Sequence, residues 1–196
     1  MEKINFIKTF IPQGDFREKY EHGGMMVRHL AAVLDEKMGA YECYECTVPI
    51  GEYDEGEIQK AFVEFTAKMD ALKLKQAKAD KIAEITAYDT SDKVNGFILN
   101  GLLVWLDKAT RVGLMNSTTI AKAACQQTTT LWLGGLKLVV DCDKAIQLLS
   151  ALEMYALDCF NVTASHKQAV SELTTIEEVE AYNYKSGYPK MLEMSV

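Results

Sequence analysis

Two cysteines three residues apart are the first group in the sequence with metal-binding chemistry. Cys43 and Cys46 form the one C-x-x-C motif, a spacing found in many zinc sites. They lie in the stretch 41–48, which alternates like a β-strand, and residues three apart on a strand point to opposite faces. Zinc also needs two further ligands, and the nearby His22 and His29 have no recognisable spacing. We therefore expect half-buried, reduced thiols and no metal.

Paired carboxylates are the second chemical possibility, because glycoside hydrolysis uses two of them in one cleft. Five aspartates flank the predicted hairpins and could meet in space. They are Asp89, Asp92, Asp107, Asp141 and Asp143. An enzyme that acts on surface glycans is therefore one of the functions to be tested.

One histidine and one arginine complete the candidates. His166 lies on the apolar stripe of a predicted long helix, where a solitary core or semi-buried histidine is a simpler interpretation than catalysis. Arg111 could bind a partner's carboxylate, although pairing with Asp107 on the same helix is the simpler account. The sequence contains no Walker loop, G-x-G-x-x-G, H-E-x-x-H or G-x-S-x-G motif. We predict a protein that is not an enzyme and has no cofactor.

Two β-hairpins position these residues. Asn100-Gly101 separates the apolar runs 97–99 and 102–106, and Gly134-Gly135 separates 129–133 from 136–140. The first turn predicts that Leu99 pairs with Leu102 and Phe97 with Val104. Since both faces of this hairpin are apolar, we expect cover on each side. The second hairpin has one apolar and one mixed face and should be half-solvated or nearer an edge of the sheet.

Helices and a short strand surround the hairpins. We predict a strand at 82–88, a helix at 108–126, a long helix capped by Asp141, and a capping box at Thr175-Ile176-Glu177-Glu178. The fold class is α+β, in which the two hairpins and the short strand form an antiparallel sheet packed by helices. Three tyrosines of the tail form either a sugar-stacking or peptide-binding platform or a cover over the core: Tyr182, Tyr184 and Tyr188.

The chain is divided into three predicted segments: a small β-rich docking segment at 1–52, an amphipathic helix at 53–82, and the α+β domain at 83–196. The helix carries an apolar seam of two heptads. Its residues are Ile58, Phe62, Phe65, Met69 and Leu72. The same seam suits packing on the chain's own domain or an intersubunit bundle, so these residues and the three tail tyrosines are candidate partner-binding residues.

Charge excludes one class of partner. The net charge is −7, and the chain contains three arginines, so a nucleic-acid backbone is a poor match. No apolar run is long enough to span a bilayer, and no secretory signal begins the sequence, so we expect a soluble protein that does not bind membranes.

Several ordered motifs resemble a known family. They are the run 81–91, Val94-Asn95-Gly96-Phe97, Trp105-Leu106-Asp107, Arg111, the run 152–156 and Gly187-Tyr188-Pro189. From about residue 78 to 196 the chain resembles the phage-associated domain-of-unknown-function family 4376.

The resemblance implies a role in a bacteriophage tail, without an established enzymatic activity. We expect a non-enzymatic structural or adaptor protein of the virion tail, made in the host bacterial cytoplasm. Its partners would be tail or tail-fibre proteins, in a homo-oligomer or a hetero-assembly. The alternatives are a tail-fibre assembly chaperone that is absent from the mature virion and, second, the enzyme acting on surface glycans.

Overall fold

The computed structural model describes residues 4–196 and has an α+β fold, as the sequence predicts. The chain divides into an amino-terminal unit that ends at Lys73 and a carboxyl-terminal unit that begins at Leu74. This boundary falls inside helix α1 (Glu55–Asp89), which contributes residues to both units.

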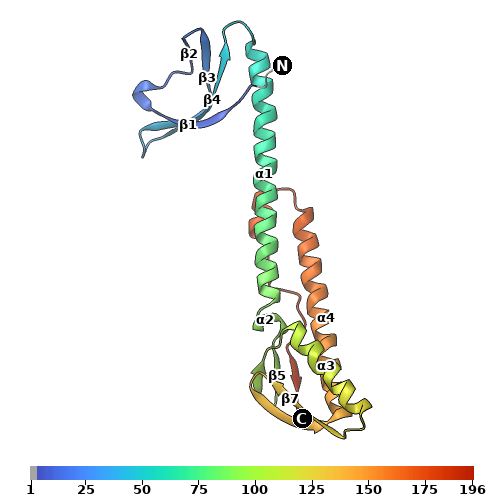
Figure 1. The fold of residues 1–196 in the computed structure, drawn as a ribbon. Helices are drawn as coiled ribbons and strands as arrows, with labels where there is room; N and C mark the ends of the chain where they lie inside the picture. The colour runs from blue at the N-terminus through green and yellow to red at the C-terminus, as the bar shows by residue number, and fades with distance from the viewer. Residues whose placement is uncertain (1–3) are drawn as a thin grey trace. The chain divides into compact units, whose positions relative to one another are not determined.

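The amino-terminal unit contains a four-stranded antiparallel sheet in the order β1-β4-β3-β2 (Figure 1). The strands are β1 (Ile7–Pro12), β2 (Lys19–His22), β3 (Met25–Asp35) and β4 (Ala40–Pro49), and a short 3₁₀ helix, η1 (Gln13–Asp15), follows β1. Gly23 and Gly24 both have positive φ angles and make the turn between β2 and β3. The β-rich character predicted for residues 1–52 is confirmed over the described residues.

Helix α1 begins with a capping box and then covers one face of this sheet. The Glu57 backbone N–H donates to Asp54 Oδ1 at 2.8 Å, and the Asp54 N–H donates to Glu57 Oε2 at 2.9 Å. Ile58 is fully buried, and Phe62 is 7 % exposed. Both belong to the core of the amino-terminal unit, so the apolar seam of the helix packs at this end on the chain's own sheet.

Helix α1 also includes residues 82–88, for which a strand was predicted, so this prediction was wrong. Ile85 is fully buried and packs with Val170 and Val179, which lie in the last two helices of the chain. Ile82 packs against the same cluster. Burial at helical spacing outweighs the weak β-propensity of this Ile- and Thr-containing stretch.

The carboxyl-terminal unit contains two small sheets. One has the order β6-β5-β9, in which β5 pairs antiparallel with β6 and parallel with β9, and the other is the hairpin β7-β8. Its elements after α1 are α2 (Asp92–Asn95), β5 (Phe97–Leu99), β6 (Leu102–Val104), α3 (Lys108–Ala123), β7 (Thr128–Leu133), β8 (Leu136–Asp141), α4 (Cys142–Glu172), α5 (Ile176–Ala181) and β9 (Leu192–Met194).

The first hairpin has the predicted register. Leu99 pairs with Leu102 and Phe97 with Val104, and Asn100 has the positive φ of 50° that the turn needs. The expectation that both hairpins join one antiparallel sheet was wrong, since each lies in a sheet of its own. The third strand beside β5 comes from the carboxyl-terminal tail, which pairs in parallel (Figure 1).

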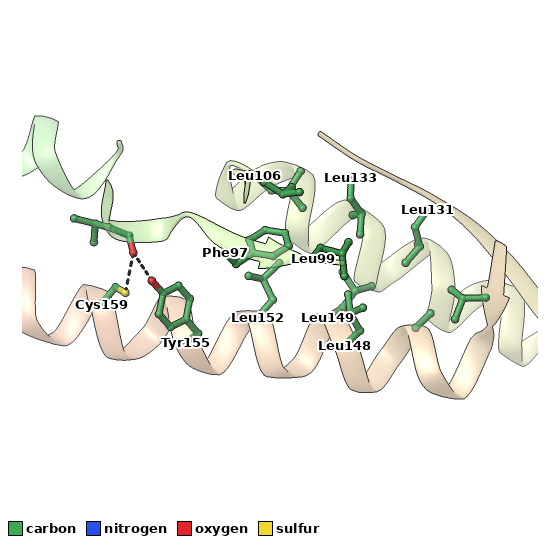
Figure 2. Packing of buried hydrophobic residues seen from close by; sticks show 14 residues of the cluster. Phe97, Leu99, Leu106, Leu131, Leu133, Leu148, Leu149, Leu152, Tyr155 and Cys159 are labelled. Carbon is green, nitrogen blue, oxygen red and sulfur yellow. Dashed lines mark hydrogen bonds between the residues drawn. The ribbon is translucent and has the colours of Figure 1, made fainter. Parts of the chain in front are cut away.

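Helix α4 holds the two sheets together through one hydrophobic core (Figure 2). Its residues Leu149 and Leu152 meet Phe97 from β5 and Leu133 from β7, and all four are at most 1 % exposed. The opposite face of the first hairpin is open, contrary to the expectation of cover on both sides: Leu103 is 57 % exposed.

Two side chains of α4 also anchor the short helix α2. The Tyr155 hydroxyl and the Cys159 thiol both donate to the Val94 carbonyl, at 2.8 and 3.3 Å (Figure 2). Burial, as the largest cause, raises the pKa of both groups, so they remain protonated donors at neutral pH.

Candidate functional site

The carboxyl-terminal unit contains a groove of about 400 Å³ between the end of α1, the start of α3 and the middle of α4. We call it the Arg111 groove. Its lining residues are Asp89, Thr90, Asn95, Trp105, Leu106, Asp107, Lys108, Arg111, Glu153, Ala156, Leu157 and Phe160. The motifs Trp105-Leu106-Asp107 and Arg111, on which the family resemblance rests, lie side by side in this lining.

Asp107 sets the start of α3 and therefore the position of Arg111 one turn later. Its carboxylate accepts the Thr110 backbone N–H at 2.8 Å and the Thr110 hydroxyl at 2.7 Å. The hydrogen bonds from Thr110, the hydroxyl first, lower the pKa of Asp107 below its ordinary value. The carboxylate is thus ionised at neutral pH and held in place in the lining of the groove.

Arg111 joins α3 to α4. It is 8 % exposed, its Nε donates to Glu153 Oε1 at 2.9 Å, and its Nη1 donates to the Leu106 carbonyl at 2.8 Å. The predicted pairing with Asp107 was wrong, because that carboxylate caps α3 and the arginine extends to α4 instead. Arg111 therefore acts inside the protein as a link between helices.

Asp89, the last residue of α1, belongs to the lining of the groove. Its Oδ1 accepts the hydroxyl of Thr163 from α4 at 2.8 Å, and its carbonyl accepts the Asn95 amide at 2.6 Å. The Thr163 hydroxyl is also 2.9 Å from the Tyr188 hydroxyl. These bonds tie the end of α1, helix α2 and the tail to α4.

Three large apolar side chains of the lining are open to solvent. Trp105 is 39 % exposed, Leu157 is 48 % exposed and Phe160 is 58 % exposed. Around a concave site, exposed apolar side chains are typical of binding surfaces.

The five candidate aspartates are not brought together as one catalytic set. Asp89 and Asp107 share the groove, whereas Asp92 begins α2 and does not line it. Asp141 caps α4 through the backbone N–H groups of residues 143 and 144, and Asp143 forms an ion pair with Lys122. A glycosidase needs a carboxyl group with a raised pKa as its general acid, and the pKa of Asp107 is shifted the other way.

The apolar seam of α1 is buried where the helix begins and becomes exposed farther along the helix. Ile58 and Phe62 are buried in its core, and Phe65 packs against the same cluster. Met69 is half-buried, and Leu72 is 59 % exposed. Partner binding by this seam stays a prediction, for which Met69 and Leu72 have the accessible side chains.

The three tyrosines near the carboxyl terminus of the chain contact helices of the carboxyl-terminal unit. The Tyr182 hydroxyl lies 2.8 Å from His166 Nδ1, and the rings of Tyr184 and Tyr188 lie 5.6 and 5.7 Å from that of Tyr88 in edge-on contacts. This arrangement agrees with a tail that folds over the core. His166 is half-buried, and its Nε2 also meets the Ser186 carbonyl at 2.9 Å.

The cysteine pair is more deeply buried than predicted. Cys43 is 1 % exposed and Cys46 2 % exposed, and the alternation of β4 places them on opposite faces of the sheet. Burial, as the largest cause, raises the pKa of both thiols. Among residues 4–196, no group of three His, Cys, Asp or Glu side chains is arranged to hold a metal ion.

Sequence reasoning missed the α4 side of the groove. Glu153, Leu157 and Phe160 were given no role, although the spacing of four and three on one helix shows that they share a face beside the buried stripe.

Comparison with curated proteins and with solved structures finds no match. In the described part of the chain, no helix combines the length and apolar character needed to cross a membrane. The chain does match a family described as Domain of unknown function (DUF4376), over residues 76–184, a range that contains every lining residue of the Arg111 groove. The chain therefore belongs to the DUF4376 family.

Proposed function

We propose that this chain is a non-enzymatic structural or adaptor protein of a bacteriophage tail, which acts through protein–protein contacts made at the Arg111 groove. The observation that carries the proposal is the exposure of Trp105, Leu157 and Phe160 around one concave site. The tail setting rests on the family resemblance in the sequence.

The polar groups of the groove support binding over chemistry. Arg111 and Glu153 pair with each other, and Asp107 caps α3, so these groups maintain the shape of the site. Fixed walls with exposed apolar side chains give a partner a preorganised surface, which lowers the ordering cost of association. A groove of about 400 Å³ receives one or two side chains of a partner, and a larger contact would extend over the surrounding surface.

Incorporation into phage particles tests this proposal. Leu157→Asp and Phe160→Asp each place a charge on the apolar wall, whereas Met154→Asp is the matched control. Met154 lies on the same helix, is 60 % exposed and does not line the groove. Copy number per particle is measured by quantitative mass spectrometry of purified particles from the phage or induced prophage that encodes the chain.

We expect a fixed small copy number for the unchanged chain and for Met154→Asp, and loss of both groove variants from the particles. Circular dichroism of each purified variant checks that folding is retained. If the unchanged chain is abundant in the lysate but missing from particles, it is a tail-fibre assembly chaperone. If folded groove variants enter particles like the control, the groove is not the contact surface.

A further inference from the structure

We infer that the Arg111 groove recognises a short basic segment of its partner, in which an arginine side chain stands next to an apolar one. This inference rests on the proposed function, because it names the chemistry of the partner at the same site. A protein segment is the proposed occupant.

The charges of the lining favour a cationic guest. Glu153 and Arg111 pair with each other and leave no net charge, so the remaining charges of the lining are the carboxylates of Asp89 and Asp107 and the cation of Lys108. The Arg111 guanidinium already donates to Glu153 and to the Leu106 carbonyl and is 8 % exposed, so it is poorly placed to receive an anion. Since the whole chain has a net charge of −7, a basic segment is also attracted at longer range.

The aromatic side chains of the lining favour arginine among the cations. A guanidinium is planar and weakly hydrated, and it stacks on an aromatic face while it donates to carboxylates at its edge. Trp105, 39 % exposed, presents the aromatic ring that attracts cations most strongly, and Phe160 presents a second ring. Leu157 and Ala156 supply the apolar contact for the neighbouring residue of the guest.

The size of the groove favours a segment over a folded surface. About 400 Å³ lies near the lower end of the range for sites that hold small ligands. It accommodates roughly two side chains, and a short segment can place an arginine and a nearby apolar side chain in it without the steric demands of a folded domain.

The two tryptophans of the chain provide a direct test with the full-length protein. In a ¹H–¹⁵N NMR spectrum each tryptophan gives one indole N–H signal. Trp105 reports on the groove, whereas Trp132, 59 % exposed on the β7-β8 hairpin, is an internal reference outside it. The probes are the peptides acetyl-Phe-Arg-amide, acetyl-Phe-citrulline-amide, whose side chain has a similar shape without charge, and acetyl-Phe-Glu-amide.

We expect the arginine peptide to shift the Trp105 signal saturably and leave the Trp132 signal in place. The citrulline peptide should bind about tenfold more weakly, because it lacks the cation. In Asp107→Asn, which keeps a good helix cap but removes one charge, the arginine peptide should bind about threefold more weakly.

Other outcomes separate this inference from the proposed function. Equal binding of the arginine and citrulline peptides, or tighter binding of the glutamate peptide, refutes basic selectivity but leaves the groove as a contact surface. Absence of any shift at Trp105 with all three peptides refutes a peptide guest, while particle incorporation of Leu157→Asp and Phe160→Asp still decides the proposed function independently. Shifts of Trp105 and Trp132 together indicate non-specific binding and also overturn the inference.

Discussion

Replacement of Arg111 by methionine should destabilise the carboxyl-terminal unit by about 3 kcal/mol. Methionine keeps much of the apolar stem but removes both hydrogen bonds. The Leu106 carbonyl then lacks its buried donor, at a cost of about 1–2 kcal/mol. The charge-assisted bond to Glu153 contributes about 1.5 kcal/mol, the lower end of its class, because that side chain is 35 % exposed and regains water.

Urea unfolding followed by tryptophan fluorescence measures this change. Trp105 and Trp132 both lie in the carboxyl-terminal unit, so the signal reports on that unit. The free energy of unfolding is obtained by linear extrapolation to water.

Two variants make the Arg111 experiment specific. Glu153→Gln keeps an oxygen acceptor for Arg111 Nε and should cost about 1 kcal/mol, less than Arg111→Met. Lys108→Met removes an exposed cation from the same helix and should stay within about 0.5 kcal/mol of the unchanged chain. The interpretation of Arg111 as a link between helices fails if Arg111→Met is as mild as Lys108→Met, or if Glu153→Gln is as costly as Arg111→Met.

Three further predictions address the caps and the thiols. Asp141→Ala should lower the free energy of unfolding in urea by about 1 kcal/mol, because it removes the cap of α4. Asp141→Asn should lower it by only a few tenths, because asparagine also caps the backbone N–H groups, and equal losses in the two variants would contradict the capping role of Asp141. The pKa of Glu178 is lowered chiefly by the backbone hydrogen bond from Thr174, so the stability that Glu178 contributes is present above its unfolded pKa and is lost as pH falls through the lower, folded pKa. In urea titrations at decreasing pH, Glu178→Gln should therefore lose less free energy of unfolding than the unchanged chain, and identical pH curves would refute this role. Iodoacetamide should alkylate the exposed Cys125 well before the buried Cys43, as followed by peptide mass spectrometry, and reaction of both at the same rate would argue against the burial described.

Features decided by neighbouring residues were predictable from the sequence. The Asn100-Gly101 turn, the Asp141 cap and the capping box of Thr175 and Glu178 all formed as predicted. Each depends on φ angles or hydrogen bonds within a few residues, so the local residue types are sufficient to specify it.

The candidate site was predictable only in part. Its motif residues Trp105, Asp107 and Arg111 were singled out in the sequence, but their arrangement was not. Arg111 was assigned to Asp107, four residues away, and it pairs instead with Glu153, which lies 42 residues away. Local spacing offers a plausible partner for such a residue, whereas the packing of α3 on α4 decides which carboxylate it meets.

The sequence by itself determined where the turns and caps lie, which register the first hairpin takes, and that the chain belongs to an α+β class. The tertiary structure alone decided that residues 82–88 are helical, that β9 pairs in parallel with β5, and that the groove forms between α1, α3 and α4. The physical reason is that these features depend on burial between segments far apart in the chain, and such contacts outweigh the small intrinsic preferences of a few residues.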